Sequence, residues 1–157
     1  MITIRKATPK DHDALVDVTL KIMADGAALA FPAVVAATRE NAALICAMMV
    51  FPCVSAGDPI LLAEENGALI GASITLIRKG PIALSRKAAY GSGWWVEPEH
   101  RRKGVLNLLL AETERILQAS GVTVWEEFIF DQNAVAARIA FDHGFNSVMR
   151  VFQKTIP

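Results

Sequence analysis

The sequence predicts an α/β fold in which one layered domain spans residues 1–157. The chain has 157 residues, enough for one hydrophobic core, and 53% of them are hydrophobic, which argues against disorder. Segments that alternate polar and apolar residues, as strands do, are interspersed with segments of helical periodicity. Their order is strand, two helices, three strands, then helix, strand, helix and strand, which is typical of a sheet covered by helices.

The N-terminal half is predicted to contain a strand, two helical regions and a hairpin. Thr8 marks the start of the first helix, because threonine is a common N-cap, Pro9 suits the first helical position and Asp11 is an acid three residues after the cap. Gly67 marks the hairpin turn. In order, these elements are a strand over 2–5, a helix from Thr8, a helical region from Pro32 to about Phe51, and strands over 60–64 and 69–78.

The C-terminal half is predicted to alternate strands and helices. Gly121 and Gly144 each follow a segment of helical periodicity, and glycine commonly ends a helix because it adopts left-handed backbone angles without steric cost. In order, these elements are a strand over Ala88–Val96, a helix over 105–118, a strand over 122–130, a helix over 133–142 and a last strand over 147–155.

Charge and composition exclude several classes of partner. The chain has 16 basic and 16 acidic side chains, whereas proteins that bind nucleic acid need surplus positive charge. The longest apolar run, residues 42–54, is interrupted by Pro52 and is too short to cross a bilayer, so we expect no membrane partner. The histidines and the two cysteines lack metal-ligand spacing, so we expect no metal. With no signal-peptide pattern at the N-terminus, a cytoplasmic location is expected.

A basic turn joins the strand Ala88–Val96 to the next helix. It consists of Arg101, Arg102, Lys103 and Gly104, and the helix begins with Val105 and Leu106. The first backbone N–H groups of a helix have no partner within it and carry partial positive charge, and a glycine lets the backbone close around an anion. The segment therefore predicts a phosphate site made mainly of main chain. An ordinary basic turn that caps a core helix explains the same residues.

The strand before this turn contains two glycines. Strict alternation places Tyr90, Ser92, Trp94 and Val96 on one face, and Gly91, Gly93 and Trp95 on the other. Glycines within a strand indicate a bulge, a close approach by a ligand, or a kink that lets a tryptophan pack. An elongated ligand with its phosphate at the turn is expected to pair with the main chain of Trp95 and Val96.

Taken together, these motifs resemble the GNAT superfamily of N-acetyltransferases. The segments that carry the resemblance are Val96-x-Pro98-Glu99 with Arg101-x-x-Gly104, the hairpin over 61–71, Asn133-x-x-Ala136 with Gly144-Phe145, and residues 4–11. The resemblance implies a mixed, mostly antiparallel sheet with helices on both faces, splayed between the strands ending at Val96 and Phe130. It also implies acetyl-CoA as acyl donor, held by Trp95, Val96, Arg101, Arg102, Lys103, Gly104, Val105, Leu106 and Asn133.

Three positions depart from the family pattern. Leu106 stands where a glycine or alanine is usual, and Ala140 stands where many members carry a tyrosine that protonates the departing thiolate. Tyr90 occupies the position at which some members carry a glutamate base. A larger side chain at Leu106 is compatible with the phosphate site if it points into the core, because the site uses backbone N–H groups.

The resemblance implies that the chain moves an acetyl group to a primary amine of a small molecule or peptide by direct attack. The candidate catalytic residues are Glu127, whose pKa a partly apolar cleft would raise, and Tyr90. The simpler explanation of Glu126 and Glu127 is two solvated or ion-paired glutamates. The apolar residues over 24–54 favour an apolar or compact amine, or form core or a homodimer contact. Two alternatives are a non-catalytic acyl-CoA-binding module and a nucleic-acid-binding domain that uses Arg101–Lys103.

Overall fold

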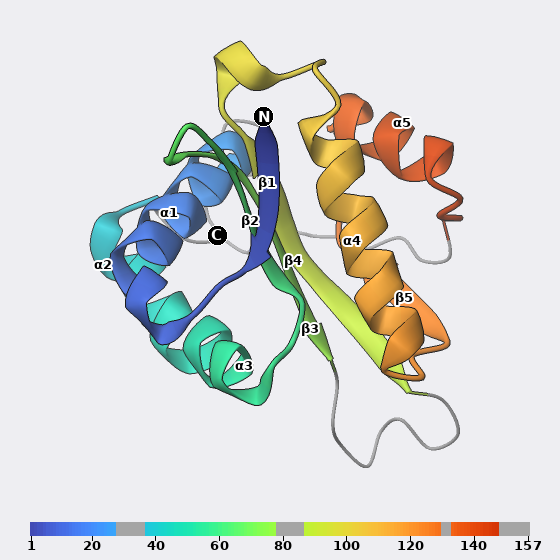
Figure 1. Cartoon of the computed structure of the whole chain (residues 1–157), viewed down its shortest axis with the longest axis horizontal. Helices are drawn as coiled ribbons and strands as arrows, with labels where there is room; N and C mark the ends of the chain where they lie inside the picture. The colour runs from blue at the N-terminus through green and yellow to red at the C-terminus, as the bar shows by residue number, and fades with distance from the viewer. Residues whose placement is uncertain (28–36, 78–86, 130–132, 148–157) are drawn as a thin grey trace, which may run out of the picture.

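A computed structural model describes residues 1–27, 37–77, 87–129 and 133–147. Within them, five strands form one sheet in the order β1-β2-β3-β4-β5 (Figure 1). The strands are β1 (Ile2–Lys6), β2 (Ile60–Glu65), β3 (Ala68–Ile77), β4 (Ala88–Val96) and β5 (Val124–Glu127). The first three pairings are antiparallel and β4 pairs with β5 in parallel. The prediction of a mixed, mostly antiparallel sheet is confirmed.

Helices cover both faces of the sheet, also as predicted. Helix α1 (His12–Ala27) lies on one face together with α2 (Arg39–Ile45), the π-helical turn η2 (Cys46–Val50) and α3 (Phe51–Ala56). Helices α4 (Val105–Ala119) and α5 (Ala134–Asp142) lie on the other face (Figure 1). Two short 3-10 turns, η1 (Pro9–Asp11) and η3 (Pro98–His100), precede α1 and α4.

Each face of the sheet has its own hydrophobic core. On the α1 face, Leu15 and Val18 of α1 pack with Cys46 and Val50. On the α4 face, the core is formed by β-strand residues and by Val105, Leu109 and Ile116 of α4. Neighbouring residues of β2 divide between the two cores, because successive strand residues point to opposite faces: Leu62 belongs to the first and Leu61 to the second.

The second helical region differs from the prediction at both ends. It begins at Arg39, because the Thr38 side chain caps it by accepting a hydrogen bond from the Asn41 N–H at 3.2 Å. It continues to Ala56, beyond Phe51; Pro32 lies outside the described residues. The π-helical turn directly precedes α3, near whose start lies Pro52. Proline has no backbone N–H to donate, and the start of a helix tolerates this.

This helical run of 18 residues, Arg39–Ala56, is long and apolar enough to cross a membrane, judged by length and composition alone. The apolar run over residues 42–54, on which the sequence analysis relied, is shorter and did not predict a helix of this length. Ala42, Cys46 and Val50 are nevertheless fully buried in the core of the α1 face. Their spacing of four residues gives the run one buried side, and 17% of the run is buried in all.

The predicted C-terminal elements are partly confirmed. Strand β5 covers only Val124–Glu127 of the predicted 122–130, and Phe130 lies outside the described residues. Helix α5 begins one residue after Asn133, which is its N-cap. The last predicted strand, over 147–155, falls outside the described residues except for Ser147, which belongs to no element.

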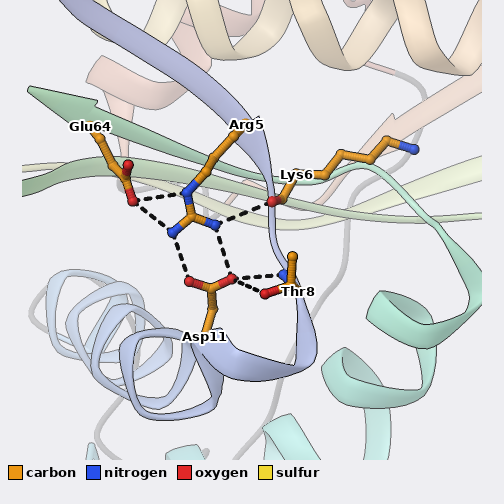
Figure 2. A network of polar contacts seen from close by, with 5 residues as sticks. All are labelled: Arg5, Lys6, Thr8, Asp11 and Glu64. Carbon is orange, nitrogen blue, oxygen red and sulfur yellow. Dashed lines mark hydrogen bonds and ion pairs between the residues drawn. The ribbon is translucent and has the colours of Figure 1, made fainter. Parts of the chain in front are cut away.

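An ion-pair network fixes the first strand to the start of α1 (Figure 2). The Arg5 guanidinium donates to Asp11 at 2.7 and 2.9 Å and to Glu64 at 2.6 and 2.9 Å. The Asp11 carboxylate also accepts from the backbone N–H and the hydroxyl of Thr8. Hydrogen bonds from Arg5, foremost, hold the pKa of Asp11 well below its usual range. The predicted helix start at Thr8 is confirmed.

Candidate functional site

Strands β4 and β5 separate partway along β4. Their pairing runs from Ala88–Val124 to Gly91–Glu127, whereas β4 continues to Val96 and stays paired with β3 as far as Gly71. The Glu97 N–H donates to the Ile70 carbonyl at 2.9 Å. Backbone groups of successive residues in an antiparallel pair point alternately toward and away from the partner, so those of Val96 face away from β3. Beyond Gly91, toward Val96, β4 thus presents an edge that no described strand covers. The predicted splay between β4 and β5 is confirmed.

A bulge in β4 changes which side chains share a face. Ile74 pairs with Gly93 and Thr75 with Gly91, so Ser92 is an extra residue in β4. The predicted strict alternation is therefore wrong beyond the bulge. Tyr90 and Trp95 both belong to the core of the α1 face, while Val96 packs on the α4 face.

The glycine at position 93 reflects contact with α1. Its φ of +147° is rare for other residues, and a Cβ there would stand 2.7 Å from Cγ2 of Ile22. The close approach of a helix thus explains this glycine, without any ligand. Trp95 lies on the same face and is covered by Lys21, whose Nζ lies 4.1 Å from its ring centroid.

The basic turn delivers the chain into α4 with an open helix N-terminus. Gly104, at φ +82°, is the N-cap residue, and its carbonyl accepts from the Leu108 N–H at 3.1 Å. The N–H groups of residues 105–107 have no hydrogen-bond partner among the described residues. Arg102 and Lys103 are exposed beside them. Leu106 packs against the core of the α4 face, so its bulk points inward, as the phosphate site requires.

Arg101 is held by contacts to two neighbouring elements. Its Nε donates to the Val96 carbonyl and its Nη2 pairs with Asp25, each at 2.9 Å. The guanidinium therefore ties the turn to the end of β4 and to α1. Its contact with acyl-CoA stays a prediction.

Asn133 and Ala140 lie at the two ends of α5. The Asn133 side chain caps the helix by accepting from the Ala136 N–H at 3.0 Å, so its amide oxygen is already used. Its contact with acyl-CoA stays a prediction. Ala140 is 6% exposed and offers no hydroxyl. His143 caps the helix end, its Nδ1 lying 2.9 Å from the Ile139 carbonyl.

Glu127 lies at the point where β4 and β5 separate, in an aromatic surround. Its Oε1 accepts hydrogen bonds from Nε1 of Trp94 at 3.2 Å and from Nε1 of Trp125 at 2.8 Å. The Phe145 ring packs against both indoles. Burial raises the pKa of Glu127 to about 8, and the two indole hydrogen bonds act in the opposite direction. The carboxyl group is thus mostly protonated at neutral pH.

Gly91 makes this arrangement possible. A Cβ at position 91 would lie 1.8 Å from Oε1 of Glu127, so the carboxyl group occupies the place of a side chain on β4. The sequence pattern did not identify Gly91, Trp94, Trp125 or Phe145 as the surroundings of Glu127. The one local signal was that Trp125, two residues before Glu127 in the same strand, shares its face.

The structure does not bring the two candidate catalytic residues together. Tyr90 points into the α1 face, where its ring meets Phe128 edge to face at 4.8 Å between centroids. Glu127 lies on the opposite face. Glu127 is buried and its pKa is raised. Among the described residues no group of three potential metal ligands occurs.

Comparison with known proteins gives a consistent picture. A profile described as "Acetyltransferase (GNAT) family" matches residues 31–145. A GCN5-related N-acetyltransferase from Ralstonia eutropha JMP134 is 16% identical with a TM-score of 0.77, covering 99% of both chains. The aminoglycoside 6'-N-acetyltransferase AAC(6')-IG from Acinetobacter haemolyticus is 17% identical with a TM-score of 0.70, again over 99% of both.

A third similar structure contains a ligand. AAC(6')-Iy in complex with a CoA-containing bisubstrate analogue is 17% identical with a TM-score of 0.69, covering 100% of this chain and 99% of that one. At these identities the likeness shows the fold. A search of curated protein sequences found no significant match.

Proposed function

Because this chain belongs to the acetyltransferase (GNAT) family, we propose that it transfers an acetyl group from acetyl-CoA to a primary amine of a small molecule or peptide. The observation that carries the proposal is the uncovered edge of β4, which leads from Glu127 to the open N-terminus of α4. The N–H groups of residues 105–107 suit a diphosphate, with Arg102 and Lys103 beside them. An extended acyl-CoA arm suits the edge near Val96.

The chemistry needs few groups from the protein. In the transfer, the amine nitrogen forms a bond to the thioester carbon, the carbon–sulfur bond breaks, and one proton leaves nitrogen while the thiolate takes one up. Backbone N–H groups on the uncovered edge of β4 can polarise the carbonyl. Glu127, with a pKa of about 8, exchanges protons readily near neutral pH. We propose that Glu127 either accepts the proton from the amine or donates a proton to the thiolate.

An apolar or compact amine is the acceptor that we propose from the apolar composition of residues 24–54. Leu44 and Met48 of the run Arg39–Ala56 are 57% and 70% exposed. An apolar surface of this kind suits an acceptor with a hydrocarbon portion better than a polycation, which would require an acidic surface.

Calorimetric titration with acetyl-CoA, CoA and ATP tests the donor site. We expect acetyl-CoA and CoA to bind much more tightly than ATP, and Gly104→Glu to weaken both by at least about a hundredfold, since bulk and negative charge would enter the phosphate site. Gly121→Glu is the matched control. Gly121 also has a positive φ, +70°, but follows the opposite end of α4. Wild-type affinity for acetyl-CoA in a folded Gly104→Glu variant would refute the placement of the phosphate site at Gly104.

Release of CoA in the presence of amines tests the reaction. A panel of sisomicin, n-butylamine, phenethylamine and a lysine peptide spans polycationic, compact, apolar and peptidic acceptors. We expect saturable CoA release with at least one of them and its loss in Glu127→Gln. Tight acetyl-CoA binding without turnover on any amine would instead support the non-catalytic acyl-CoA-binding module.

A further inference from the structure

Helix α1 contacts both ends of η3, the 3-10 turn between β4 and the basic turn. Glu97 directly precedes η3 and Arg101 directly follows it. On α1, Nζ of Lys21 lies 2.8 Å from Oε1 of Glu97, and Oδ2 of Asp25 lies 2.9 Å from Nη2 of Arg101. Because Lys21 and Asp25 are four residues apart, they lie on one face of the helix. This face of α1 therefore holds the segment between β4 and α4 at two points.

The two ion pairs have opposite polarity. Helix α1 supplies the cation that pairs with Glu97 and the anion that pairs with Arg101. A shift of α1 by one turn along its axis would bring Lys21 toward Arg101 or Asp25 toward Glu97, and like charges repel. The charge pattern thus favours one placement of this segment on α1 and opposes the neighbouring placements.

Close packing between the same elements fixes the position of α1 against β4. Ile22 lies so near to Gly93 that a Cβ there would stand 2.7 Å from its Cγ2. Lys21 also covers the ring of Trp95, a residue that is 5% exposed, with its Nζ 4.1 Å from the ring centroid. Lys21 is therefore held by an aromatic ring and a carboxylate together, which is more than a surface ion pair alone provides.

The position of Arg101 affects the open N-terminus of α4. Its Nε donates to the Val96 carbonyl at 2.9 Å, so the guanidinium joins β4 to α1. Three residues separate Arg101 from Val105, the first residue of α4. Because this connection is short, a displacement of Arg101 also displaces the N–H groups of residues 105–107.

We propose that Lys21 and Asp25 are positioning residues for the phosphate site. They act through Glu97 and Arg101, and they set where the basic turn and the first N–H groups of α4 lie. The consequence for acetyl-CoA rests on the proposed function.

The direction of the effect separates positioning from electrostatic attraction. Asp25 carries a negative charge beside the segment that leads to the proposed diphosphate site, so its charge alone opposes binding. Attraction alone therefore predicts tighter binding of acetyl-CoA when Asp25 is made neutral. Positioning predicts weaker binding, because the segment loses one of its two ion pairs with α1.

Calorimetric titration with acetyl-CoA measures this effect. We expect Asp25→Asn and Lys21→Met each to weaken binding by about two- to fivefold, the range for a partly exposed ion pair, and the double variant by about tenfold. Asp25→Glu and Lys21→Arg keep the charges and should bind within about twofold of wild type. In kinetics, KM for acetyl-CoA should rise by the same factor while kcat is unchanged.

Two variants are matched controls. Asp17 is also an aspartate of α1 in an ion pair, but its partner is Arg39 of α2, so Asp17→Asn tests a general loss of α1 stability. Glu99 is exposed within η3, so Glu99→Gln removes a negative charge from the same segment and leaves both α1 pairs intact. Neither variant should weaken acetyl-CoA binding, and equal weakening in Asp17→Asn would overturn the proposal.

A measurement without ligand keeps this proposal separate from the proposed function. Residual dipolar couplings of the N–H groups of residues 105–107 report their orientation in the free protein. The double variant should change these couplings, and Asp17→Asn should not. Unchanged couplings, or wild-type or tighter acetyl-CoA binding in the double variant, would overturn the proposal. Changed couplings in a protein whose wild type does not bind acetyl-CoA would support the positioning role and count against the proposed function.

Discussion

Replacing Glu127 with glutamine is expected to stabilise the protein, increasingly so at higher pH. The folded pKa of Glu127 is about 8 and its ordinary value is 4.5. A carboxyl group whose pKa is raised by folding binds its proton more tightly in the folded state. The free energy of unfolding is therefore highest below the unfolded pKa and decreases as the pH rises through the folded pKa. At about 1.4 kcal/mol per pH unit, the wild type loses about 4 kcal/mol between pH 5 and pH 9. Glutamine is uncharged throughout and keeps an oxygen for the indoles.

Urea unfolding at pH 5, 7 and 9 measures this difference. We expect wild type and Glu127→Gln to differ by less than about 1 kcal/mol at pH 5, and the variant to be more stable by about 4 kcal/mol at pH 9, with equal denaturant slopes. Glu126→Gln controls for the loss of one negative charge at the adjacent position. Parallel stability curves for wild type and Glu127→Gln across this range would refute the inference that burial raises the pKa of this carboxyl.

Two further substitutions test how the site and the fold are held. Gly91→Ala places a methyl group 1.8 Å from Oε1 of Glu127, so the carboxyl group must move away from the indoles. The pKa of Glu127 should then fall toward 4.5, and the rate of acetyl transfer should drop about a hundredfold. Wild-type activity with an unchanged pKa would contradict this. Arg5→Met removes the pairs with Asp11 and Glu64 and should lower the unfolding free energy by about 1–2 kcal/mol at pH 7, a partly solvent-screened value. Because the pKa of Asp11 is depressed, this difference should shrink as pH falls below 4; a constant difference down to pH 3 would contradict it.

The features that the sequence predicted well are those set by neighbouring residues. The helix start at Thr8 depends on Asp11, three residues later, and the hairpin turn depends on Asn66 and Gly67, which both have positive φ. The open N-terminus of α4 follows from Gly104 and the residues beside it. Such local signals need no knowledge of the rest of the fold.

The features that the sequence did not predict depend on contacts between distant segments. The faces of β4 depend on a bulge. Next to this bulge, Ile22 of α1 packs close to Gly93, a contact between residues far apart in the chain. The tie from Arg101 to Asp25 likewise joins segments 76 residues apart. Alternation along one strand carries no information about the bulge, so it placed Tyr90 on the same face as Val96, whereas the structure places them on opposite faces.

The environment of Glu127 does not match that of a solvated or ion-paired glutamate. A solvated glutamate would not have a pKa of about 8, and among the described residues no cation pairs with it; two indole N–H groups are its partners. Keeping an ionisable group there lowers stability near neutral pH, whereas a glutamine would avoid that loss. A destabilising carboxyl, given room by a glycine at the point where two strands separate, is the arrangement expected of a proton-transfer group.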